Sequence, residues 1–156
     1  MSPTPHSYAF IDWIGERLRR ASGGMLGEGS LFFHRESNVA QKIRSSLASG
    51  LGYCCEVSNA SFHPEAERDP NNRFADMEVE VVITRGPMAK VDTTPIAESV
   101  YADFVGRCTT TTTPQLVRVG DVWVGDLEAS VDAATGAISH SFRLITKIDL
   151  TPQTTQ

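Results

Sequence analysis

The sequence predicts an α+β domain in which a mainly antiparallel sheet of four strands carries helices on one face. Two stretches, 74–85 and 138–150, alternate apolar and polar residues with the period of two that is typical of a half-buried strand. Other stretches place apolar residues three and four apart, as amphipathic helices do. The order is helix, then helix–strand–strand twice. Helices on a single side can therefore cover every strand, and a ferredoxin-like topology is compatible with this order.

Composition favours one globular domain. The chain has 156 residues, 40% of them hydrophobic and 21% charged, which suffices for a single core. The formal charge is −5 and the densest basic cluster is "RLRR", so a surface that binds nucleic acid through many phosphate contacts is not expected. The N-terminus has no secretory pattern, and no apolar run approaches a membrane span, so we expect a cytoplasmic protein without membrane contact.

Residues 1–35 are predicted to form an N-terminal helix and a glycine-rich arm. Apolar residues at helical spacing predict a helix over 7–21, and the glycines of "SGGMLGEGS" end it. That segment matches neither phosphate-loop pattern, and no strand precedes it. The triplet Leu31, Phe32 and Phe33 is apolar and requires burial, so we expect it to dock on a neighbouring subunit.

A single domain is predicted over 36–150, followed by a polar tail over 151–156. Asn38 and Gln41 have capping-box spacing at the start of a second helix, and glycines end that helix near residue 50. A strand follows over 53–62 and then a polar loop over 63–73, a length at which loops often make contacts.

The strand 74–85 carries three carboxylates on its polar face, at Asp76, Glu78 and Glu80. One interpretation is a solvated face on which like charges repel mildly and favour solubility. The other is that this face lines a ring or meets a basic neighbour. The sequence leaves both open.

The last part of the chain is predicted as a helix and a hairpin. Thr94 and Pro95 suit the start of a helix over 94–108. In the strand 120–131, alternation places four residues on one face: Trp123, Leu127, Ala129 and Val131. The final strand, 138–150, could reach roughly 40 Å at about 3.3 Å per residue, longer than a small domain needs. We therefore expect it to extend past its own domain and pair or pack across an interface, with Arg143 and Lys147 as further inter-subunit contacts.

No pattern of catalytic or metal-binding residues is present, so we expect no catalytic residue, metal or cofactor. The four histidines lie in separate predicted elements without metal-ligand spacing: His6, His34, His63 and His140. Cys54, Cys55 and Cys108 suit reduced thiols better than a disulfide framework. No nucleophile motif of the G-x-S-x-G type occurs.

Three segments together resemble the tail-terminator and tail-completion proteins of long-tailed bacteriophages. They are the helix "NVAQKIRSSLA" before a strand, the strand "FADMEVEVVITR" before the helix "TPIAESVYADFVGRC", and the closing hairpin "VWVGDLEASVDAATGAISHSFRLITKIDL". The resemblance covers residues 38–150 and is one of pattern rather than of a signature motif.

The resemblance implies a structural virion protein that forms a homo-oligomeric ring, hexameric in the family, on the end of a finished tail tube. Its implied partners are the tail tube protein and the head–tail connector protein, and its implied place is the neck of the virion, after assembly in the host cytoplasm. DNA passes through such a ring without specific binding, which suits an acidic lumen.

Two alternatives stay open. The chain is another connector of the same neck, or it is a small ferredoxin-like ligand-binding or enzymatic domain. In the last case its cleft would be lined by Trp123, Tyr101 and His140.

Overall fold

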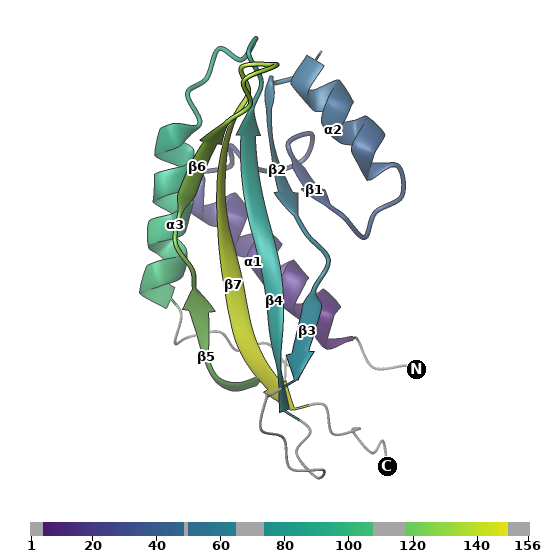
Figure 1. Ribbon diagram of the computed structural model, residues 1–156, viewed down its shortest axis with the longest axis vertical. Helices are drawn as coiled ribbons and strands as arrows, with labels where there is room; N and C mark the ends of the chain where they lie inside the picture. Colours follow the sequence, from purple (N-terminus) through teal and green to yellow (C-terminus); the bar gives the residue numbers. More distant parts are fainter. Residues whose placement is uncertain (1–4, 49, 65–73, 108–117, 150–156) are drawn as a thin grey trace.

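The computed structural model describes residues 5–48, 50–64, 74–107 and 118–149 (Figure 1). Along the chain, the elements in these ranges are α1 (His6–Ala21), β1 (Leu31–Phe33), α2 (Val39–Ala48), β2 (Tyr53–Val57), β3 (Ser61–Pro64), β4 (Phe74–Arg85), α3 (Thr94–Arg107), β5 (Arg118–Val124), β6 (Glu128–Val131) and β7 (Ile138–Asp149).

The strands form one open, mixed sheet in the order β1-β2-β4-β7-β5, with β3 beside β4 and β6 beside β7. The pair β1–β2 is parallel and the other pairs are antiparallel. The α+β class is confirmed, but the predicted four-stranded sheet is wrong, because the described residues contain seven strands. The triplet assigned to an arm forms β1, and two of the predicted strands are each divided in two.

The two central strands, β4 and β7, pair along their whole length, from Phe74 opposite Asp149 to Arg85 opposite Ile138. The other edge of β7 is paired with β5 and β6. Both edges of β7 are therefore paired with strands of the same chain. For the described residues, the expectation that β7 extends across an interface and pairs with another subunit is wrong.

On each side of this central pair, the connection between the two flanking strands contains one extra residue, and β5 has a further register shift between Arg118 and Val122. Three residues lie between Val57 and Ser61, and only two lie between their partners on β4. On the other side, three residues lie between Val124 and Glu128, opposite two on β7. Such bulges reverse the alternation of side chains beyond them.

The bulge before β6 corrects the predicted face of the last hairpin. Trp123 lies opposite Ile145, whereas Ala129 lies opposite His140 and Val131 opposite Ile138. Ile145 and His140 are five apart on β7, so their side chains point to opposite faces. Trp123 therefore does not share a face with Ala129 and Val131.

Helices α1 and α3 cover one face of the sheet and form the core with it (Figure 1). Ring contacts join the three layers. The ring centroids of Trp13 and Phe104 lie 5.6 Å apart, and those of Phe104 and Phe142 of β7 lie 5.7 Å apart. Arg17 of α1 donates two hydrogen bonds to Asp103 of α3, at 3.1 and 2.8 Å, with both side chains largely buried. Residues 1–35 and 36–150 were predicted as separate parts, but α1 and β1 belong to the same core and sheet as the rest.

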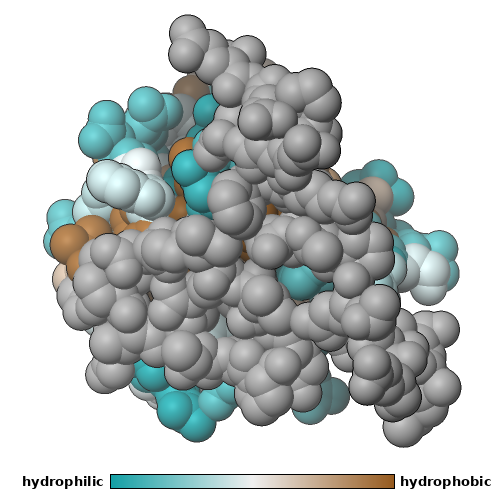
Figure 2. Space-filling model, turned by 90° about the horizontal axis from the view of Figure 1, so that it is seen from below, coloured by the Kyte–Doolittle hydropathy of each residue, from teal (hydrophilic) through white to brown (hydrophobic). Residues whose placement is uncertain are grey.

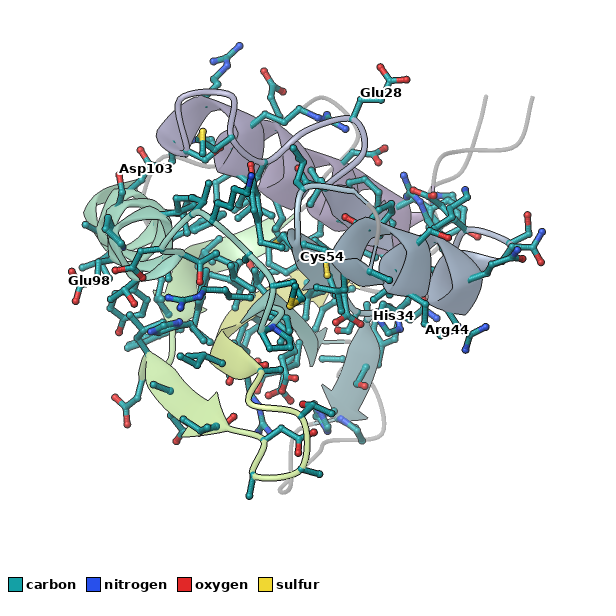
Figure 3. The ribbon with its side chains drawn as sticks, turned by 90° about the horizontal axis from the view of Figure 1, so that it is seen from above. Glu28, His34, Arg44, Cys54, Glu98 and Asp103 are labelled. Carbon is teal, nitrogen blue, oxygen red and sulfur yellow. The ribbon has the colours of Figure 1, made fainter. Side chains whose placement is uncertain are left out.

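Helix α2 lies at the edge of the sheet beside β1 and β2, not with the other two helices. Phe32 and Cys54 point away from the core face, yet they are only 7% and 0% exposed. Cys54 lies between α2 and the sheet in Figure 3. The hydroxyl of Ser46 is shared between the backbone carbonyls of Gly29 and Tyr53, which fixes α2 there. The prediction that all helices lie on one face is therefore wrong.

The second face of β4 and β7 is not covered by any described helix (Figure 1), and we call it the open face. It consists of the polar-face residues of the two strands: Asp76, Glu78, Glu80, Val82 and Thr84 of β4, and Ser139, Ser141, Arg143, Ile145 and Lys147 of β7. Figure 2 views the molecule from the end where β4 begins, and the described residues visible there are mostly hydrophilic. Among the described helices, none is long and apolar enough to cross a membrane.

Gly52 should be intolerant of any side chain. Its φ is +83°, and a Cβ atom would lie 2.8 Å from the Cα of Ala89. Gly23 has a similar φ of +64° but has nothing within 4 Å, so Gly23→Ala is the matched control for backbone strain alone. We expect Gly23→Ala to cost about 1 kcal/mol of unfolding free energy and Gly52→Ala at least about 2 kcal/mol, measured by urea denaturation. Equal losses would show that the loop at Ala89 moves freely.

Candidate interaction site on the open face

The open face brings together residues that the sequence assigned to two different surfaces. Asp76 lies opposite Lys147, and Glu80 lies opposite Arg143. The carboxylates predicted to line a lumen and the cations predicted to contact a neighbour therefore share one surface of a single chain.

Arg143 is shared between two carboxylates. Its Nη1 lies 3.4 Å from Glu78 Oε1, and its Nε lies 3.5 Å from Glu80 Oε2. Glu78 also accepts a 2.9 Å contact from His63 Nε2 of β3. Because the Arg143 side chain is 63% exposed and both of its distances are long, each pair contributes well under about 1 kcal/mol. These groups stay free to exchange partners.

Both bulges lie at the level of the cross-strand pair Glu80 and Arg143, one on each side of it. The N–H of Ser58 donates to the carbonyl of Glu80 at 3.0 Å, and the N–H of Gly125 donates to the carbonyl of Arg143 at 2.8 Å. The two bulges therefore kink the sheet on either side of the same ion pair.

A hollow of about 300 Å³ opens at the second bulge. Its lining is mostly polar and consists of Glu80, Gly125, Asp126, Glu128, Ser141, Phe142 and Arg143. Asp126 has no ion-pair partner among the described residues, and neither does Glu128. Neither carboxylate was predicted from the sequence. The signal was a glycine followed by aspartate inside a strand pattern, which is typical of a bulge.

Trp123 precedes the bulge by two residues, does not line this hollow, and has 71% of its surface exposed. It is opposite Ile145 and therefore on the open face. Tyr101, by contrast, lies on the helix side, where its ring contacts Phe142 at 5.4 Å and its hydroxyl donates to the carbonyl of Gly125 at 2.7 Å. His140 is also on the helix side and is buried. The cleft predicted from Trp123, Tyr101 and His140 is therefore not formed.

The apolar triplet of β1 is buried within its own chain. Leu31, Phe32 and Phe33 are 6%, 7% and 8% exposed. The ring of Phe33 occupies the space above Gly15 of α1, where a Cβ would lie 2.6 Å from it. Their apolar surface is thus already buried, and an inter-subunit role would require β1 to leave the sheet.

The two described cysteines are buried on opposite faces of β2. Cys55 lies in the core and Cys54 lies beneath α2. Burial, with a smaller contribution from the charge of Glu56, raises the pKa of Cys54 to about 12. Burial also raises the pKa of Cys55 well above its ordinary value. Neither is a thiolate near neutral pH, so neither is a nucleophile there. Cys108 lies outside the described residues.

The described histidines remain apart. His34 contacts Glu56 at 2.9 Å, and His63 contacts Glu78. Within the described ranges, no three His, Cys, Asp or Glu side chains lie close enough together to hold a metal ion.

No family model matches the chain, and no curated protein matches it. A solved structure without a functional description is similar over 94% of each chain, at 11% identity and a TM-score of 0.47. A likeness of this size carries no argument about function.

The thiols of Cys54 and Cys55 should be protected in the folded protein. At about pH 8 we expect iodoacetamide to modify them only as fast as the protein opens, and both to react at once in urea. Peptide mass spectrometry counts modification at Cys108 separately. Because the pKa of Cys54 rises from 9.0 to about 12 on folding, the unfolded thiol loses its proton first. Stability should therefore fall as pH increases through this window. Rapid labelling of Cys54 under native conditions would contradict the packing of α2 on β2, and rapid labelling of Cys55 would contradict its place in the core.

Proposed function

We propose that the protein is a structural subunit of the neck or tail of a long-tailed bacteriophage. It forms a homo-oligomeric ring that caps the tail tube and joins it to the head connector. The proposal rests on the resemblance of residues 38–150 to tail-terminator proteins and on one observation, the open face of β4 and β7.

The open face supports assembly because it combines exposure with interface chemistry. It presents an exposed tryptophan, an exposed arginine and loosely held carboxylates on a rigid sheet. Trp and Arg are the residues that most often dominate protein interfaces. A sheet face with such side chains favours a role in contact with another macromolecule.

Charge on this side of the molecule also suits a ring through which DNA moves. The open face carries three carboxylates, Asp76, Glu78 and Glu80, against two basic side chains, Arg143 and Lys147. This slightly acidic surface offers phosphate no excess of cations, so DNA would pass without binding.

The proposal predicts self-association that depends on tail tubes or on concentration. The purified full-length chain should form a ring by itself, or remain monomeric and form one when tail tubes are added. Light scattering coupled to size exclusion gives the mass, and negative-stain microscopy shows the ring.

The control is an unrelated acidic protein of similar mass mixed with the same tubes, which should not bind their ends. Binding to tube ends separates a tail terminator from another neck connector, since only the first requires a finished tube. A chain that stays monomeric at all concentrations and ignores tubes would overturn the proposal.

A further inference from the structure

We propose that the corner of the open face around Trp123 is the surface that binds a second copy of this chain, and that α2 of that copy is the occupant. This inference rests on the proposed function, because it names the contact that builds the ring.

The corner surface consists of Trp123, Asp126 and Glu128. The indole is 71% exposed although it stands on a sheet beside the half-buried Ile145, so it has a supporting apolar neighbour. A large aromatic side chain held rigidly by a strand is typical of an interface anchor. Folding of the single chain leaves most of the apolar surface of the indole in water, and a bound partner would remove that surface from water.

The charge beside Trp123 is unbalanced. Residues 125–132 contain three acidic side chains, Asp126, Glu128 and Asp132, and no basic one. Asp126 and Glu128 form no ion pair within the described ranges, and Arg143, which lines the same hollow, is divided between Glu78 and Glu80. The occupant of this corner should therefore be basic.

Helix α2 has the complementary charge. Residues 39–48 contain Lys42 and Arg44 and no acidic residue. Lys42 is paired with Glu36, whereas Arg44 is exposed and forms no ion pair within the described part of the chain. Figure 3 shows Arg44 pointing outward from α2.

An exposed apolar residue stands at the end of the same helix. Leu51 is 52% exposed. It is held there because the N–H groups of Gly50 and Gly52 donate to the carbonyls of Ser45 and Ser46. The α2 surface thus offers a cation for the carboxylates and an apolar side chain for the indole.

The two surfaces lie at opposite edges of the sheet. Helix α2 is beside β1 and β2, and the corner is on β5 at the other end of the strand order. In the ring that we propose, each copy offers α2 to one neighbour and its own corner surface to the other. Head-to-tail contacts of this kind close into rings when the rotation permits.

A charge exchange tests this contact in the full-length protein. We expect Asp126→Lys/Glu128→Lys to weaken self-association about tenfold, Arg44→Glu to do the same, and the triple variant to recover most of the loss. Trp123→Ala should weaken it at least about thirtyfold. Arg19→Glu is the matched control, since Arg19 is exposed on α1 and forms no ion pair among the described residues.

Analytical ultracentrifugation measures the association, with tail tubes added if they are needed, and circular dichroism confirms that each variant folds. Loss in both partial variants with recovery in the triple variant supports the contact, because a general effect of net charge would change association in opposite directions for Asp126→Lys/Glu128→Lys and for Arg44→Glu. A wild-type ring that all these variants form equally well overturns this inference and leaves the proposed function standing. A wild-type chain that never associates overturns both.

Discussion

The twelve-residue pairing of β4 with β7 is the constraint on which the rest of the structure depends. Each strand has one apolar face, and the register aligns the two, with Val81 opposite Phe142 and Val79 opposite Leu144. A slip by one residue would expose every one of these side chains and bury the carboxylates instead. The β4–β7 pair therefore fixes which side receives α1 and α3 and which side becomes the open face.

The register between the central pair and its flanking strands changes at the cross-strand pair of Glu80 and Arg143. On both sides an extra residue is inserted opposite Glu80 and Arg143, so the side chains beyond it point to the other face of the sheet. The bulge at Gly125 is also supported from below, since Tyr101 of α3 donates to its carbonyl. The position of Asp126 and Trp123 on the open face is thus determined by the helix layer as well as by the sheet.

Much of the fold could be predicted from the sequence because the dominant signals are local. The helical stripe of α3 and the alternation of β4 and β7 depend only on residues a few positions apart. The bulges could not be predicted, because an extra residue is visible only against a partner strand, and Trp123 was consequently grouped with Ala129. Nor could the pairing of β1, since three apolar residues do not reveal a parallel partner distant in the chain.

The candidate site shows the same division. Periodicity identified Asp76, Glu78 and Glu80 as one face, but only the register shows that Arg143 lies among them and moderates their charge. An isolated acidic stripe would repel both DNA and other acidic surfaces. A stripe with an exchangeable arginine can instead release Glu78 or Glu80 to a new cation when a partner approaches, because weak exposed pairs are readily replaced. The open face can thus stay slightly acidic as a whole and still exchange one of its own ion pairs for a new one.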